Sequence, residues 1–514
     1  MHTHTPKKKS LSRSTLLVSA CTFCSRMIGF ARDMLVANLF GATLDADAFV
    51  MANKIPNFLR RLFSDGAFSQ AFVPVLSEYR KLKGEDEVQG FLNHISGVLA
   101  LTLLIVTVIG VVAAPFVVML FAPGFGHDDL RYELTTTMLR ITFPYILFVS
   151  LAGLGAAVLN SYDKFGIPAF TPVLLNFAVV GAALWICPHL DQPVVGLAIG
   201  VFIGGVIQLF FQIPFLLRIR RLPIPRPSLK DPGVRKVMKL MAPALFGVSV
   251  GQINIMIDQW FASFLAVGSL SWLYYSDRVV QLPLGVFAVA IATVILPRLS
   301  RSHAGHEHDQ YERTLDWGLR SILLIALPST LGLILYSGPI VTTLFLHGEF
   351  DANDVSMTLR SMIAFSFGLT GAMATKILAS GFYAKQNIKL PVKIGIISMV
   401  ANTLFSLCLV WSLEHAGLAL ATSLSSTLNA ILLFVMLRKK QGFYLQPGWA
   451  KFLMQMAIGL VAMAVVWYFL TPDLSAWIKH TTLWRAGCLA IDMSAVMVAY
   501  AAGLFFSGYR WHKL

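Results

Sequence analysis

Long apolar segments recur along the whole chain, separated by short charged or proline- and glycine-rich connectors. A helix needs about 20 apolar residues to cross the hydrocarbon core of a bilayer, whereas barrel strands would alternate apolar and polar residues over about ten positions. The segments fall at 15–38, 46–77, 91–122, 134–159, 169–187, 193–217, 240–266, 270–297, 318–342, 355–383, 391–412, 417–437, 451–470 and 484–507. We therefore expect an all-α polytopic membrane protein with 14 transmembrane helices.

The composition agrees with a membrane protein. Hydrophobic residues make up 56% of the chain and charged residues 13%, whereas soluble domains carry about 25% charged residues. A net charge of +15 would suggest a nucleic-acid partner in a soluble protein. In a membrane protein, the basic residues must first be assigned to the two sides of the membrane. With the N-terminus inside, 29 of the 41 Lys and Arg residues fall in inside segments and 3 in outside segments. This asymmetry predicts that both termini are cytoplasmic, with no nucleic-acid partner.

The first half of the sequence recurs in the second half at an offset of about 224 residues, and internal repeats are typical of alternating-access transporters. The first copy contains Asp33, Ala37, Asp47, Lys54 and the Phe-Val-Pro-Val-Leu-Ser ending at Ser77; the second contains Asp258, Ala262, Ser271, Arg278 and the Ile-Leu-Pro-Arg-Leu-Ser ending at Ser300. We predict two pseudo-symmetric six-helix lobes, 1–217 and 240–437. A basic cytoplasmic linker, 218–239, joins them, and two additional helices occupy 438–514.

Charged residues inside the predicted spans are the main functional signal, because an arginine at a helix centre costs about 2.5–3.5 kcal/mol on insertion scales. The basic ones are Arg26, Arg32, Lys54, Arg60, Arg61, Arg140, Arg278, Arg360 and Lys376, and the acidic ones are Asp33, Asp65, Asp258 and Asp277. Local pairing, as in Arg32–Asp33, Arg61–Asp65 and Asp277–Arg278, or snorkelling explains part of this set. For Arg140, Arg360 and Lys376 that explanation is favoured.

Local pairing explains less in the first two spans, where basic residues outnumber acidic ones. Arg26 and Asp33 are seven positions apart and share a helix face, whereas Arg32 points about 120° away. Because a guanidinium group binds phosphate through two parallel hydrogen bonds, these residues predict an anion site. Together with Arg278 they could converge on a cavity between the halves. The residues of this predicted cavity are Arg26, Arg32, Lys54, Arg60, Arg61, Asp277 and Arg278.

Signatures of enzymes are missing from the sequence. It contains no G-x-x-x-x-G-K-[ST] phosphate loop, no H-E-x-x-H metal motif and no paired carboxylates suited to hydrolysis. We expect a protein that is not an enzyme, with no cofactor and no metal site. His303, His306 and His308 form a cluster in a predicted cytoplasmic loop, where a solvated loop is favoured over metal binding.

Several motifs resemble the bacterial MurJ (MviN) family, nearly from end to end. They are S-R-M-I-G-F-A-R-D at 25–33, D-A-D-A-F at 45–49, K-I-P-N-F-L-R-R-L-F at 54–63, D-G-A-F-S-Q-A-F-V-P at 65–74, F-P-Y at 143–145, Asn160, Y-S-D-R at 275–278 and G-F-Y-A-K-Q-N-I-K-L-P-V-K at 381–393. The resemblance implies a flippase of the multidrug/oligosaccharidyl-lipid/polysaccharide exporter superfamily. Such a protein moves lipid II, the undecaprenyl-pyrophosphate-linked peptidoglycan precursor, across the cytoplasmic (inner) membrane. It also implies that the last two helices form a groove for the lipid tail.

The resemblance implies roles for single residues as well. It makes Arg26, Arg32, Arg60 and Arg278 cavity arginines that bind substrate, with Asp33 and Asp47 as supporting acidic positions. Gln281 departs from the acidic residue of some relatives, which leaves open whether the membrane potential or an ion gradient drives transport. The expected partners are lipid II, membrane lipids and proteins of cell-wall synthesis, and we expect a monomer.

Two alternative functions remain open on the sequence. One is an exporter of another undecaprenyl-pyrophosphate-linked oligosaccharide, which would need the same anion site. The other is a drug or cation antiporter of the same superfamily. An antiporter would be expected to place carboxylates rather than arginines at its site, so the excess of basic residues argues against it.

Overall fold

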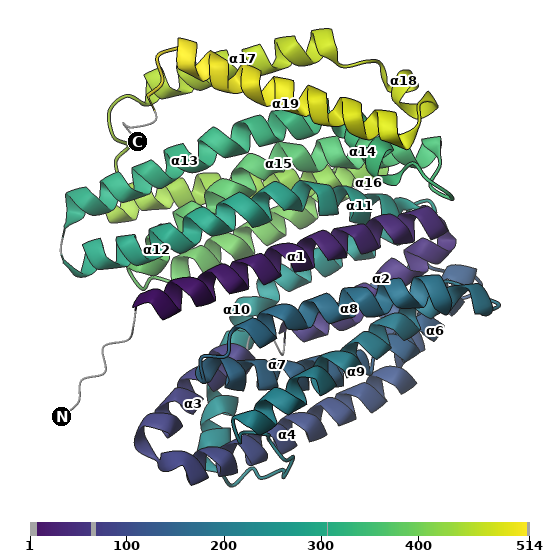
Figure 1. The fold of residues 1–514 in the computed structure, drawn as a ribbon, viewed down its shortest axis with the longest axis vertical. Helices are drawn as coiled ribbons and strands as arrows, with labels where there is room; N and C mark the ends of the chain where they lie inside the picture. The colour runs from purple at the N-terminus through teal and green to yellow at the C-terminus, as the bar shows by residue number, and fades with distance from the viewer. Residues whose placement is uncertain (1–7, 63–67, 306, 511–514) are drawn as a thin grey trace. The chain divides into compact units, whose positions relative to one another are not determined.

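The computed structural model describes residues 8–62, 68–305 and 307–510, and these residues form helices without any β-strand (Figure 1). The helices before residue 268 are α1 (Lys8–Phe40), α2 (Leu44–Arg60), α3 (Ser69–Leu82), α4 (Gly84–Val112), α5 (Ala114–Phe121), α6 (Leu130–Thr142), α7 (Tyr145–Ser161), α8 (Gly166–Trp185), η2 (Cys187–His189), α9 (Val195–Arg218) and α10 (Pro232–Ala262). Those after it are α11 (Ser269–Pro283), η3 (Leu284–Ala288), α12 (Val289–Ala304), α13 (His308–Leu335), α14 (Ser337–Phe345), α15 (Ala352–Ala384), α16 (Lys389–Gln441), α17 (Trp449–Leu470), α18 (Leu474–Lys479) and α19 (Thr482–Phe506). The expected all-α class is confirmed for this part of the chain.

Ten helical segments of the described chain are long and apolar enough to cross a membrane. The 53 residues of α16 would extend about 80 Å at 1.5 Å per residue, more than twice the roughly 30 Å hydrocarbon core. Glu414 interrupts this helix with φ 53° and ψ −133°, between the predicted spans 391–412 and 417–437. The charged helices α1, α2 and α3 are not among the ten segments. Apolarity therefore supports a multi-pass membrane protein, and the count of 14 spans stays a prediction.

The order of helices in the first part of the chain recurs in the second. A long helix followed by a short one occurs as α4 and α5 and again as α13 and α14, and the short helices begin 223 positions apart, at Ala114 and Ser337. The same spacing separates the starts of α8 at Gly166 and α16 at Lys389. This recurrence matches the offset of the sequence motifs.

The chain divides into two compact units, 1–267 and 268–514. Within the first unit, α10 packs against α3 and α4, although the sequence places most of this helix in the second lobe. A core of buried aromatic and aliphatic side chains, including Phe72, Phe91 and Val234, fills the space among α3, α4, α7 and the start of α10. The predicted lobes group helices by repeat order whereas the compact units group them by packing, so the lobe boundaries stay a prediction.

The basic linker between α9 and α10 is docked on α4. The backbone N–H of Arg226 donates to the Asn93 carbonyl at 3.0 Å, and the backbone N–H of Ile224 donates to the Asn93 side chain at 2.8 Å. The Gln89 side chain donates to the carbonyl of Leu222 at 2.8 Å. These hydrogen bonds to its backbone hold the linker in place against the first unit.

Asp231 ends the linker and begins α10. Its Oδ1 accepts from the backbone N–H of Gly233 at 2.7 Å and of Val234 at 3.2 Å, and His94 Nδ1 lies 2.9 Å from its Oδ2. Although partial burial acts to raise the pKa of Asp231, these hydrogen bonds hold the pKa below its ordinary value. A depressed pKa means that this cap stabilises the fold above the ordinary carboxyl range and is lost as the pH falls through the lowered value.

Close contact between the linker and Gly97 leads to a testable prediction. A Cβ at Gly97 would lie 2.3 Å from the backbone nitrogen of Pro227, whereas a Cβ at Gly90 on the same helix meets nothing within 4 Å. We expect Gly97→Ala to undock the linker and to accelerate tryptic cleavage within 218–230. Gly90→Ala should leave cleavage unchanged or slower, because alanine favours a helix over glycine by about 1 kcal/mol. Equal protection of the two variants would contradict the docking.

The two C-terminal helices belong to the second unit, where α17 and α19 run beside each other next to α13 (Figure 1). Gly459 and Gly503 allow close backbone approach, since a Cβ on Gly503 would lie 2.9 Å from the Gly459 Cα. The Tyr500 hydroxyl donates to the Leu324 carbonyl of α13 at 2.9 Å. Asp316 of α13 accepts from the Trp449 indole at 2.6 Å, so both helices are tied to α13.

Candidate substrate site

Arg32 of α1 is held by two neighbours. Its Nη2 and Nε donate to Asp33 Oδ1 at 2.6 Å and 3.0 Å, and its Nη1 donates to Asn176 Oδ1 of α8 at 3.0 Å. The Asn176 amide donates in turn to the Ser25 carbonyl at 3.2 Å. The Arg32 side chain is 12% exposed and that of Asp33 4%. The predicted Arg32–Asp33 pair is therefore present, and Asn176 fixes the direction of the guanidinium.

The other predicted residues of the first unit lie on α1 and α2. Arg26 is exposed on α1, two turns before Asp33. On α2, Arg60 donates through Nε to the Asn57 side chain at 3.2 Å and Lys54 is half-buried, while Arg61 is exposed just after the helix. Asp47 is 1% exposed in the first turn of α2, where the positive end of the helix dipole favours a carboxylate.

Arg278 and Asp277 lie on α11 of the second unit. Arg278 Nη2 donates to the Tyr274 hydroxyl at 2.9 Å, and the guanidinium carbon lies 4.9 Å from the centre of the Tyr274 ring. The amide of Gln281 donates to Asp277 Oδ2 at 2.6 Å. A carboxylate at position 281 would face Asp277 one helical turn away and repel it, whereas the glutamine binds it. Gln281 therefore leaves Asp277 as a hydrogen-bonded carboxylate rather than one of an acid pair.

The structure brings some of the predicted residues together and leaves others apart. Arg32 and Asp33 form an ion pair within the first unit, whereas Arg278 belongs to the second unit. Asp65, the predicted partner of Arg61, lies outside the described residues. Convergence of the four arginines on one cavity stays a prediction.

Two buried polar residues, Asn176 and Asp492, were not singled out from the sequence. Asn176 lies 144 positions from Arg32, and no local pattern connects them. Asp492 is buried in α19, where a lone acid in a long apolar segment is itself a signal.

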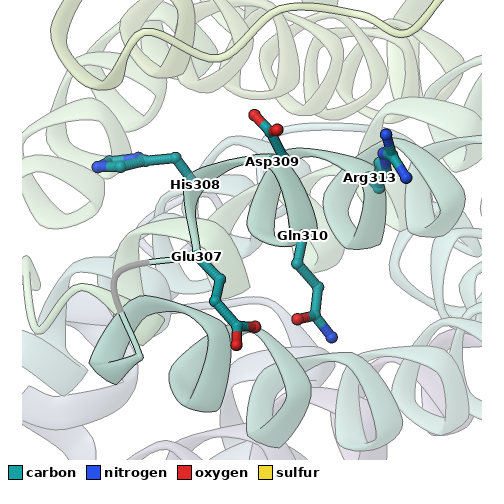
Figure 2. A pocket seen from close by; sticks show the side chains of 5 residues that line it. All are labelled: Glu307, His308, Asp309, Gln310 and Arg313. Carbon is teal, nitrogen blue, oxygen red and sulfur yellow. The ribbon is translucent and has the colours of Figure 1, made fainter.

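The predicted histidine cluster does not form a metal site among the described residues. His306 lies outside them. A pocket at the start of α13 is lined by Glu307, His308, Asp309, Gln310 and Arg313. Their side chains point in different directions, as Figure 2 shows, and do not converge on a common point. His303 lies in the last turn of α12 and His308 begins α13, so these two histidines are in helices rather than in the expected loop.

Comparison with known proteins matches residues 36–487 to the family model described as lipid II flippase MurJ. The chain belongs to the MurJ family. A protein of Haemophilus influenzae named probable lipid II flippase MurJ is 44% identical over 96% of this chain and 99% of its own length. A lipid II flippase MurJ of Burkholderia cenocepacia is 40% identical over 98% of both chains.

Solved structures agree with this assignment. A lipid II flippase MurJ in an inward closed conformation superposes with a TM-score of 0.82 at 26% identity, over 96% of this chain and 100% of that one. An inward-facing multidrug resistance MATE family transporter gives a TM-score of 0.68 at 14% identity, over 83% and 98%, which shows a shared fold. MurJ proteins are transporters of the cell inner membrane that serve peptidoglycan biosynthesis, and they are not a class of catalytic enzymes.

Proposed function

We propose that this protein flips lipid II from the cytoplasmic to the periplasmic leaflet by alternating access. The observation that carries the proposal is the relationship, over nearly the whole chain, to proteins named lipid II flippase. The fold and the multi-pass membrane character support the same function.

The proposal includes 14 membrane spans. In chain order they are α1, α2 with α3, α4 with α5, α6 with α7, α8, α9, α10, α11 with α12, α13 with α14, α15, the two parts of α16, α17 and α19. The break at Glu414 and the recurrence of helix order support this count. Two lobes of six spans would then alternate access. An even count would place both termini on the same side, and the distribution of basic residues makes that side the cytoplasm.

The headgroup pyrophosphate would bind a cationic cavity formed by Arg26, Arg32, Arg60 and Arg278, with Lys54 and Arg61 adding positive charge. Among these arginines, Arg32 has a guanidinium that Asp33 and Asn176 hold in one orientation. A restrained planar fork loses little conformational freedom when it binds an oxyanion. The anion would meet a site already oriented for bidentate contact.

The lipid tail would lie against the two appended helices. Both expose large apolar side chains, which suits contact with hydrocarbon. These include Met454, Val461, Tyr468 and Phe469 on α17 and Ile491, Met497, Val498 and Phe505 on α19. A groove here would be reachable from the bilayer, as a carrier lipid longer than a phospholipid requires.

The membrane potential would drive export in part. The cytoplasm is negative, and each charge that crosses the full potential gains about 2.3 kcal/mol per 100 mV, so an anionic headgroup moves outward downhill. The empty cationic cavity is drawn toward the negative side, which favours the cytoplasm-facing state after release. This coupling needs no carboxylate at Gln281.

Transport by the purified protein in liposomes tests the proposal. We expect lipid II flipping above that of protein-free vesicles, and slower flipping when a potassium ionophore collapses the potential at constant pH. Flipping of another undecaprenyl-pyrophosphate-linked oligosaccharide instead of lipid II would indicate the first alternative, and exchange of organic cations without lipid movement would indicate the antiporter. Unchanged flipping on depolarisation would exclude voltage as a driver.

A further inference from the structure

Asp492 lies in the middle of α19, the last membrane span. It follows the start of the helix at Thr482 by ten residues, or about 15 Å, in a bilayer core of roughly 30 Å. Its relative exposure is 5%. Asp492, Val496 and Gly503 share the buried stripe of the helix, so the carboxyl faces the protein and not lipid.

The basic residue of α19 does not neutralise this acid. Arg485 lies two turns earlier on the same face, but its guanidinium donates to four backbone carbonyls. These belong to Trp477 at 2.7 Å, Ile478 at 2.8 Å, Leu346 at 3.1 Å and Thr342 at 3.4 Å. Within the described residues, no ion pair involves Asp492.

The groups beside the carboxyl are hydroxyls and a thiol. Tyr336, at the junction of α13 and α14, and Thr471, after α17, lie next to it, and Cys488 is one turn earlier on α19. Thr471 donates its single hydroxyl hydrogen to the Tyr336 oxygen at 3.2 Å. With one hydroxyl hydrogen, Thr471 can give an ionised Asp492 at most one hydrogen bond, and only by turning that hydrogen away from Tyr336. Among the residues that the structure describes, none hydrogen-bonds Asp492 Oδ2.

An ionised carboxylate in these surroundings would be buried without a cation or a full set of donors, which is far less favourable than the neutral acid. Water could solvate the charge only if α19 moved away from the helices that bury it, because Asp492 is 5% exposed and α19 packs against α17 and α14. We propose that Asp492 is a proton-binding site, protonated while α17 and α19 are packed together on α13 and α14. When they separate, the O–H bond breaks and the proton passes to water. The inference concerns the second unit alone and does not rest on the proposed function.

Infrared spectroscopy of the full-length purified protein tests the protonation state directly. We expect a carboxylic-acid C=O band at neutral pH that shifts when aspartate is labelled with carbon-13, and that Asp492→Asn removes. Asp473→Asn changes an exposed acid near Thr471 and should keep the band. If no band in the wild type shifts on labelling, or if Asp492→Asn leaves it in place, the carboxyl is ionised and the proposal fails.

Thermal unfolding across pH gives a second readout. An acid that is protonated when folded and ionised when unfolded makes the protein less stable as the pH rises, because the unfolded state binds fewer protons. Asparagine mimics the neutral acid and does not titrate. We expect the folding equilibrium constant of Asp492→Asn, relative to the wild type, to rise about tenfold per pH unit near neutrality. Parallel pH profiles for the two proteins would overturn the proposal, and Asp473→Asn should show such parallel behaviour.

Discussion

Alanine at Arg26, Arg32, Arg60 or Arg278 is expected to abolish or cripple lipid II flipping while folded protein remains in the membrane. Each substitution would remove one charge-assisted contact to pyrophosphate, which costs about 1.5–3 kcal/mol, or roughly one to two decades in affinity. Flipping in liposomes and complementation of a depleted strain measure the effect. Arg32→Lys should restore less function than the positive charge alone would suggest, because lysine cannot reproduce the bidentate fork.

A matched control for this series is Arg140→Ala. Arg140 also lies inside a predicted span, but it is exposed on α6, and we predict that its side chain snorkels to the membrane interface. We expect this variant to flip lipid II normally. Normal complementation by three of the four cavity variants would place the site elsewhere.

Loss of Arg485 should cause the largest loss of stability in the C-terminal part of the chain. The residue is 6% exposed, and its guanidinium binds carbonyls at the ends of α14 and α18, where the helix dipoles favour a cation. Arg485→Ala leaves these carbonyls without their donor, and we expect a loss of about 3 kcal/mol in the free energy of unfolding, as for other buried charged hydrogen bonds. Thermal unfolding of the purified protein measures this loss.

Lysine at position 485 should recover part of the stability, since an ammonium group keeps the charge but cannot span acceptors on both α14 and α18. Lys479→Ala removes an exposed charge at the end of α18 and serves as the control, with little expected change. If Arg485→Ala unfolds at the same temperature as Lys479→Ala, the guanidinium does not stabilise this end of the unit.

The sequence by itself determined the helical membrane class, the family and the arginine-rich first helices. These properties depend on short stretches of sequence and not on which helices pack together. A long apolar segment indicates a helix in lipid, and a charged residue inside such a segment is recognisable without knowledge of the fold. The i,i+1 pair Arg32–Asp33 could be predicted for the same reason, because neighbours on one helix meet in any fold that keeps the helix.

The tertiary structure decided which distant groups meet. Asn176 orients Arg32 across 144 positions of sequence. The segment between α9 and α10 docks on α4 because Gly97 leaves room for its backbone, and α10 packs with the first unit although the repeat places it with the second. Arg485 stands at the start of the predicted span 484–507, and only the structure shows that its guanidinium is bound to four backbone carbonyls. Hydrophobic periodicity defines the buried face of each helix but not the neighbour that covers it, and that neighbour determines whether a polar group is paired, solvated or protonated.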